Sequence, residues 1–291
     1  MMEWALLVVL IPAIVIPIVL LFGFAGCQLV FPLKDNPVFP GTVSAEVGSR
    51  SAITVRWEYT GMEAARFEVR RKRSLDATFE LVSPPAFTES EFTDTGLDED
   101  TSYDFRVIAI IGSEPTGPGE VTAVTFGKVF EATLPAEVAG PNRGVVQRIE
   151  PARLARSGSR VQLTLQRPSG GALIINRLSL SHAAAAGDPY DSAGPPALLV
   201  DAADPLFIPA DPAAGTLELP AIDFALDQTR PLLVAFDVGG VGQVRLLTGV
   251  SFSEATTFAA PPGVQEAAIA DRQTGYTAIN SITLIQRIDA G

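Results

Sequence analysis

Short runs in which apolar and polar side chains alternate recur from about residue 53 to the end of the chain. Ile53, Val55 and Trp57 share one face of the first run, and Phe67 and Val69 share one face of the next. A period of two is that of a half-buried β-strand, whereas an amphipathic helix would repeat every 3.6 residues or so. The 25 glycines and 23 prolines suit many short strands joined by turns. The sequence therefore predicts an all-β fold for most of the chain.

The first group of alternating runs predicts a sandwich of about seven strands. Its most specific stretch reads GLDEDTSYDFRV. This stretch resembles the G-L-x-x-x-T-x-Y-x-F-R-V signature of the fibronectin type III family, and the resemblance covers the whole group of runs. It implies that the Tyr103 hydroxyl bonds to backbone just upstream and that Leu97 closes one end of the core. Trp57 fits the family's buried tryptophan, and Phe105 falls on the aromatic position of the signature.

These signature residues are expected to be core and corner residues, since large aromatic side chains at period two are usually packing residues. The run from Arg70 to Arg73 is the one basic cluster of this region. We interpret it as a solvated strand edge, where charge opposes edge-to-edge pairing, and not as a binding patch.

A second group of alternating runs begins at Arg160 and closes at Ile288. Their lengths and their lack of helical period predict an antiparallel sandwich of the jelly-roll type. An Ala- and Pro-rich stretch, residues 183–212, predicts a long loop. This region resembles only loosely the β modules of bacterial surface proteins and of phage tail or fibre proteins. No motif in this region assigns a functional role from those proteins to a residue of this chain.

No charged residue occurs between Trp4 and Phe31. A helix needs about 20 apolar residues to cross the core of a bilayer, and in lipid a single segment satisfies its own backbone only as a helix. Pro12 and Pro17 would kink such a helix, as membrane helices tolerate. The segment therefore predicts an N-terminal transmembrane anchor.

A cleaved lipoprotein signal is the alternative interpretation of the same segment. Phe24-Ala25-Gly26-Cys27 resembles the bacterial lipobox, in which the cysteine is lipidated after cleavage before it. The chain departs from that pattern because Phe24 stands where Leu is usual and Glu3 stands where basic residues are expected. Cys27 is the lipidation candidate under this interpretation, and either interpretation tethers the chain to a membrane.

The net charge of −12 and the pI near 4.6 argue against nucleic-acid binding, which depends on neutralising phosphates with basic residues. The single cysteine, Cys27, rules out an intrachain disulfide. The only histidine is His182, so most histidine-based metal sites are excluded. We expect His182 to be an ordinary packing or surface residue.

Carboxylates cluster in the predicted long loop, and such loops can supply oxygens to Ca²⁺. Their spacing matches no known calcium loop, and aspartate is common in turns, so no metal or cofactor site is assigned. The sequence shows no phosphate-binding glycine loop, zinc spacing or nucleophile elbow, and we expect no enzymatic activity. The clustered carboxylates are those of Asp188, Asp191, Asp201, Asp204 and Asp211.

The sequence thus predicts a membrane-anchored, non-enzymatic structural or interaction protein of a membrane or cell-surface assembly, bacterial and with its β domains outside the cytoplasm. Its partners would be the membrane and other proteins. One alternative is a carbohydrate-binding or adhesive surface lipoprotein, in which Tyr190, Phe207 and Tyr276 are the few aromatic residues that could stack on glycans. The other alternative is a phage virion component of the tail or fibre. The expected divisions are an anchor (1–31), a linker (32–41), the fibronectin-like domain (42–127), an irregular connector (128–142) and the second sandwich (143–291).

Overall fold

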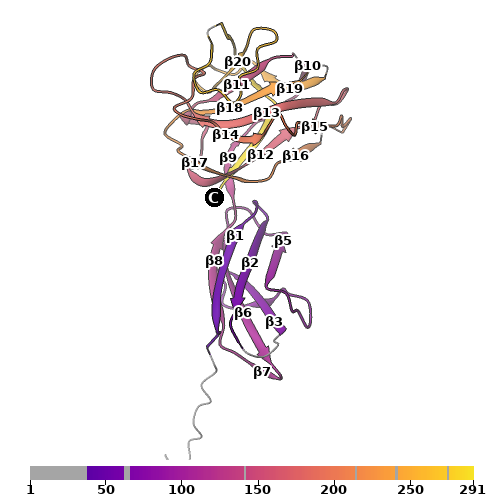
Figure 1. The fold of residues 1–291 in the computed structure, drawn as a ribbon, viewed down its shortest axis with the longest axis vertical. Coiled ribbons are helices and arrows are strands. Elements are labelled where there is room, and N and C mark those ends of the chain that lie inside the picture. The colour runs from indigo at the N-terminus through magenta and orange to yellow at the C-terminus, as the bar shows by residue number, and fades with distance from the viewer. Residues whose placement is uncertain (1–37, 62–65, 141, 214, 240–241, 274) are drawn as a thin grey trace, which may run out of the picture.

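The computed structural model describes residues 38–61, 66–140, 142–213, 215–239, 242–273 and 275–291, which form two β-sandwich domains stacked end to end (Figure 1). Strands dominate this part of the chain, and its one helical element is the 3₁₀ turn Pro151–Arg153. The predicted all-β fold is therefore confirmed for the described residues. None of their helices is long and apolar enough to cross a bilayer. The predicted anchor (1–31) and its Cys27 lie outside the described residues.

The first domain is a sandwich of a three-stranded and a five-stranded antiparallel sheet. The three-stranded sheet has the order β1-β2-β5, and the other has the order β4-β3-β6-β7 with β8 also paired to β6. The strands are β1 (Gly41–Val47), β2 (Ala52–Tyr59), β3 (Arg66–Arg73), β4 (Glu80–Leu81), β5 (Glu91–Thr95), β6 (Ser102–Ile111), β7 (Glu114–Pro115) and β8 (Gly119–Val124).

The core of the first domain follows the two-residue period of its sequence. Ile53, Val55 and Trp57 on β2 are buried, whereas the residues between them are more exposed. The Trp57 ring meets the Phe67 ring edge-on, with the centroids 5.3 Å apart. Phe39 is also buried in this core, although it was predicted to lie in the linker (32–41). The first domain therefore begins before the predicted boundary at residue 42.

The second domain contains three antiparallel sheets, where a jelly roll would have two. Their orders are β14-β13-β18-β11-β20-β21 with β15 paired to β13, β16-β12-β23-β9 with β17 paired to β12, and β10-β19-β22. Apolar side chains of all three sheets share one core, which confirms a sandwich at that coarser level.

The strands of the second domain are β9 (Gly127–Glu131), β10 (Ala136–Ala139), β11 (Gly144–Ile149), β12 (Gly158–Gln166), β13 (Leu173–His182), β14 (Ala197–Val200), β15 (Leu206–Ile208), β16 (Thr216–Glu218), β17 (Ile222–Leu226), β18 (Leu232–Val238), β19 (Gln243–Thr248), β20 (Ala255–Ala259), β21 (Thr277–Ile279), β22 (Ser281–Thr283) and β23 (Ile285–Ala290).

Two predicted irregular segments contain strands. The expected connector, 128–142, contributes most of β9, which pairs with β23, and all of β10, which pairs with β19. The expected long loop, 183–212, contains β14 and β15, both paired with β13. These four strands are only three to five residues long and lie near prolines, so their sequences resemble loops. The true link between the domains is Thr125 and Phe126, which alone separate β8 from β9.

Candidate functional site

The described residues contain no group of three or more His, Cys, Asp or Glu side chains placed to hold a metal ion. Two aspartates of the predicted long loop accept hydrogen bonds from nearby backbone amides. Asp201 accepts a hydrogen bond from the Ala203 amide at 3.0 Å, and Asp211 accepts one from the Ala213 amide at 2.9 Å. Both are turns closed by an aspartate side chain, a common role of this residue. The candidate carboxylates are therefore not brought together around a cation.

His182 lies buried at the end of β13, with its ring stacked on Phe224 at a centroid distance of 5.4 Å. Its Nε2 lies 3.1 Å from the amide nitrogen of Asp227, and its Nδ1 lies 3.3 Å from the carbonyl oxygen of Pro231. The same Nε2 lies 3.2 Å from the carbonyl oxygen of Ala225. His182 is thus a packing residue that ties β13 to the chain around β17 and β18.

Asp188 and Asp191 belong to a clasp between two loops, which we call the Arg272 clasp. The guanidinium of Arg272 is buried and donates to the carbonyl of Tyr190 and, at 3.2 Å, to the hydroxyl of Ser192. Its backbone amide donates to Asp191 at 2.9 Å. Burial disfavours the charge and lowers the pKa of Arg272. No sequence pattern marked Arg272, because Tyr190, Asp191 and Ser192 lie some 80 residues earlier in the chain.

The aromatic residues proposed to stack on sugars are mostly unavailable. Tyr190 stacks on Tyr276 with ring centroids 4.4 Å apart, and Tyr190 is only 5% exposed. Phe207 differs, being 61% exposed on β15. The structure thus places two of the three candidates together inside the second domain and one alone on its surface.

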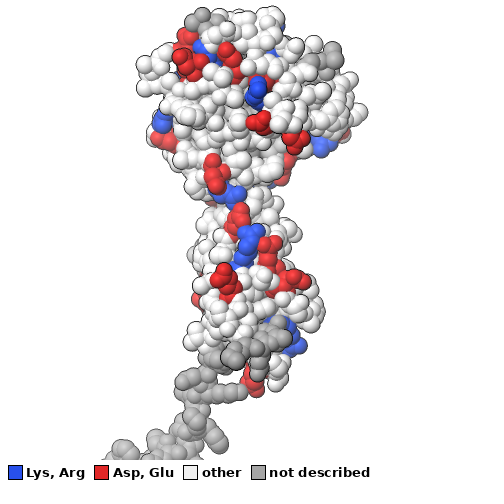
Figure 2. Space-filling view, in the orientation of Figure 1, with Lys and Arg blue, Asp and Glu red and all other residues white. Residues whose placement is uncertain are grey.

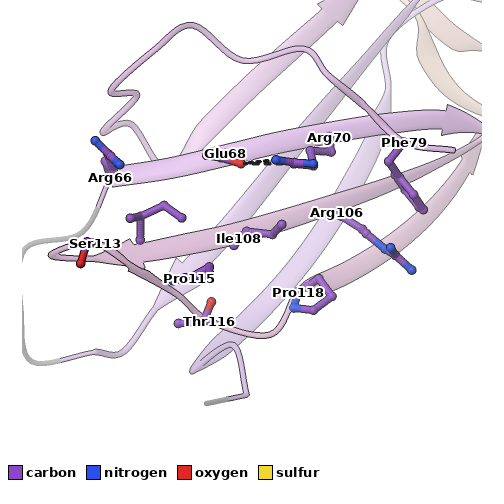
Figure 3. A pocket seen from close by; sticks show the side chains of 11 residues that line it. Arg66, Glu68, Arg70, Phe79, Arg106, Ile108, Ser113, Pro115, Thr116 and Pro118 are labelled. Carbon is purple, nitrogen blue, oxygen red and sulfur yellow. Dashed lines mark hydrogen bonds and ion pairs between the residues drawn. The ribbon is translucent and has the colours of Figure 1, made fainter. Parts of the chain in front are cut away.

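A hollow of about 490 Å³ lies on the outer face of the β3–β6 sheet in the first domain (Figure 3). Glu68 and Arg70 of β3 form an ion pair of 2.8 Å along its wall. The Arg106 guanidinium stacks on the ring of Phe79, 4.0 Å from its centroid. Arg106 also pairs with Glu120, which lies outside the lining, and Arg66 is the remaining charged residue of the hollow.

In the basic run Arg70–Arg73, Arg70 and Arg71 lie between β4 and β6, whereas Lys72 and Arg73 pair only with β6 among the described strands. Arg71 lies 2.9 Å from the buried carboxylate of Asp94, and Lys72 lies 3.4 Å from Asp104. Burial is the largest influence on Asp94 and raises its pKa, although Arg71 opposes that shift. The predicted strand edge is therefore covered at Arg70 and Arg71, and the side chains of the run are ion-paired.

The signature residues share the core of the first domain, and Leu97 and Tyr103 lie at its end that meets the second domain. The Tyr103 hydroxyl accepts a hydrogen bond of 3.0 Å from the amide of Asp98, the upstream backbone bond that the resemblance implies. Leu97, Trp57 and Phe105 are all buried in the same core. The loop that carries Leu97 and Asp98 faces the second domain, so the corner supports the residues that make the junction.

Arginine–carboxylate pairs cross the junction in both directions. From the first domain, Arg50 pairs with Glu218. From the second domain, Arg160 pairs with Glu46 at 3.1 Å and donates to the carbonyl of Val47 at 2.8 Å. Two further pairs from the second domain are Arg156 with Asp100 and Arg287 with Glu99. Figure 2 shows basic and acidic atoms side by side where the two domains meet.

Arg287 is the most enclosed of these arginines, with 13% of its side chain exposed. Burial opposes its charge, but the carboxylates of Asp289 and Glu99 outweigh that effect and raise the pKa of Arg287. Asp289 itself is fully buried and lies 2.6 Å from Arg287. The junction therefore includes a buried charge pair, which fixes geometry more than it adds stability.

Phe126 fills the centre of the junction. It is 1% exposed, its amide donates to the carbonyl of Ser49 at 3.3 Å, and its carbonyl accepts from the Asp100 amide at 3.1 Å. A Cβ atom added to Gly291 would come within 2.5 Å of the Phe126 ring, so that ring packs directly on the last strand of the second domain. Phe126 thus contacts both domains, and both backbone groups of this link residue are hydrogen-bonded.

No model of a known protein family matches this chain. No curated protein matches it either.

Solved structures with a similar course of the chain include a two-domain fibronectin type III segment from chicken tenascin, 11% identical, which covers 85% of this chain and 98% of that one with a TM-score of 0.28. Another, described as a myokine structure, is 20% identical, covers 31% and 97%, and has a TM-score of 0.28. Titin module A71 from human cardiac muscle is 25% identical, covers 28% and 86%, and has a TM-score of 0.25. At these scores the likeness carries no conclusion about function.

Proposed function

We propose that this protein is a non-enzymatic structural or interaction protein, in which the first sandwich is a rigid spacer that presents the second sandwich to its partners. The observation that carries the proposal is the junction. A two-residue link, a buried phenylalanine and ion pairs from four arginines join the two domains, which supports a rigid connection. Domains joined by a flexible linker would have relative motion as the default.

The proposal includes a membrane tether at the N-terminal side. The uncharged segment from Trp4 to Phe31 would hold the chain in a bacterial membrane, as a helix or through a lipidated Cys27, with the sandwiches outside the cytoplasm. Tethering raises the local concentration of the second domain at the surface, so weak contacts suffice. Extraction that requires detergent, and an intact mass that reports cleavage before Cys27 or its absence, test this part.

Distance measurements between two spin labels test the spacer. Leu75 is fully exposed in the first domain and Phe252 is 55% exposed in the second, so cysteines at these positions, with Cys27→Ser, accept labels without disturbing the cores. A rigid spacer gives one narrow distance distribution. A broad distribution in the otherwise unchanged protein contradicts the proposal.

A further inference from the structure

An apolar pocket of about 260 Å³ lies between two sheets of the second domain. Val145 and Phe236 of the seven-stranded sheet form one side, and Val244 and Leu246 of β19 form another. Val138 and Ile279 also line the pocket and are 48% and 43% exposed, so they mark its mouth. None of the described residues that line it is charged. We call this space the inter-sheet pocket.

The polar groups of the inter-sheet pocket already have partners. The Thr257 hydroxyl donates to Gln147 Oε1 at 2.8 Å, and the Thr283 amide donates to the same oxygen at 2.8 Å. The Gln147 amide group donates to the carbonyls of Thr256 and Ser281, both at 3.2 Å. An occupant therefore gains little from hydrogen bonds inside the pocket and gains mainly from burying apolar surface.

The size of the pocket limits the occupant to one apolar group. A dry cavity of about 150 Å³ holds a benzene molecule. The inter-sheet pocket, at about 260 Å³, is large enough for the side chain of a leucine or a phenylalanine, whereas drug-sized ligands occupy pockets of about 300 Å³ and more.

Two sheet edges carry the mouth residues. Among the described strands, β21 ends the seven-stranded sheet and β10 ends the three-stranded sheet. All three residues of β21, Thr277–Ile279, are exposed and uncharged. Edge strands of soluble proteins are usually protected by charge, by proline or by a covering element. The edge of β21 has no charge or proline of its own, and a segment added to it would bond through its backbone.

The register places alternate side chains of such a segment over the pocket. Ile279 pairs with Thr257 and Thr277 pairs with Ala259, so both lie on the face of β20 and β21 that lines the pocket. A strand added beyond β21 keeps this alternation, because side chains of neighbouring strands share a face. One side chain of the added strand then faces the pocket mouth beside Ile279.

We propose that the inter-sheet pocket and the edge of β21 together bind an extended, uncharged segment of a partner protein, which adds to β21 and inserts one leucine-sized or phenylalanine-sized side chain. The absence of charge on the lining and on β21 matches an uncharged segment. This inference rests on the proposed function, in which the second domain makes the contacts. It names the partner class and the surface.

A displayed library of random eight-residue peptides, selected on the full chain without detergent that could fill the pocket, tests the inference. Selected peptides are expected to share one large apolar residue between uncharged neighbours. Its replacement by alanine is expected to weaken binding by about tenfold or more, because the buried apolar area is lost. Binding is also expected to slow amide hydrogen exchange in β21.

Two variants locate the site, and a third is their matched control. Ile279→Asp at the mouth and Ala278→Pro on the edge are expected to abolish binding, because one introduces a charge and the other removes a backbone donor. Val138→Asp provides a second mouth variant if either of these unfolds. Ile174→Asp makes the same change at another exposed isoleucine, 38% exposed on β13 and outside the pocket, and is expected to bind normally.

The inference is overturned if no peptide is selected, if selected peptides bind the Ile279→Asp and Val138→Asp variants as well as the unchanged protein, or if a free hydrocarbon such as toluene enters the pocket while no peptide does. Arg160→Gln separates this outcome from failure of the spacer. That variant loosens the junction and is expected to leave peptide affinity unchanged.

Discussion

Arg160 Nη1 lies 3.1 Å from Glu46 Oε1, and this pair joins β12 of the second domain to β1 of the first. Arg160 also lies 3.2 Å from Asp223 of its own domain, and Glu46 also pairs with Arg56. A network of several charges holds geometry better than an isolated surface pair. Substitution of Arg160 or Glu46 is therefore a direct test of what sets the orientation of the two domains.

Arg160→Gln is expected to broaden the distance distribution between labels at Leu75 and Phe252. Thermal stability should change little, since a partly exposed ion pair contributes about 1 kcal/mol or less. Arg106→Gln is the matched control, because Arg106 pairs with Glu120 inside the first domain. If both substitutions broaden the distribution equally, the junction pairs do not set the orientation.

Acid is expected to loosen the junction. Hydrogen bonding from Arg56 and the charge of Arg160 hold the pKa of Glu46 below its ordinary value of 4.5. A carboxyl with a lowered folded-state pKa contributes stability above its unfolded pKa, and the contribution is lost as the pH falls through the folded pKa. The label distribution should therefore be narrow at neutral pH and broaden below about pH 4.

Glu46→Gln is the control for that pH dependence. It removes the ionisable group, so part of the broadening should already be present at neutral pH and less should be added by acid. A variant with the same acid response as the unchanged protein would show that Glu46 is not responsible.

Tyr103→Phe is expected to lower the free energy of unfolding of the first domain by about 1 kcal/mol or somewhat more, because the Asp98 amide loses its acceptor. Tyr59→Phe is the matched control. The Tyr59 hydroxyl is buried and has no hydrogen-bond partner among the described residues, so its removal should be neutral or stabilising. Chemical denaturation of both variants measures the difference, and equal losses would contradict the role given to Tyr103.

Arg272→Met is expected to destabilise the second domain by roughly 3 kcal/mol, because several buried carbonyl and hydroxyl acceptors lose their shared donor. Hydrogen exchange should rise first in the two loops that the clasp joins, 188–192 and 266–273. Arg230→Met, at an exposed position, is the control and should change neither quantity. Unchanged exchange in both loops for Arg272→Met would refute the clasp.

The two-residue period of the sequence was enough to predict the strands with regular alternation, such as β2, β3 and β6. The Tyr103 corner was predictable because all its parts lie within a few residues. Strands β9 and β10 were missed because they are short and flank Pro135, and their partners β23 and β19 are more than 100 residues away. Period and composition do not reveal such pairings.

The junction was not predictable for the same reason. Arg50 and Glu218 are 168 residues apart, and neither stands out in a chain with many surface charges. Only the fold brings them together. The inter-sheet pocket likewise depends on how three sheets close around one core, because Val138, Val244 and Ile279 belong to separate alternating or short runs.

The first and last strands of the second domain are neighbours. β9 pairs with β23, and Gly127 lies opposite Ala290 beside Phe126. The first and last residues of the second domain therefore lie next to each other, at the same point of contact with the first domain. Another sandwich whose two ends are adjacent could be grafted after Phe126. It is expected to keep the same contacts with the first domain if it carries the arginines that pair with Glu46, Glu99 and Asp100. If the first domain presents the second as proposed, the second domain can be exchanged without altering the first.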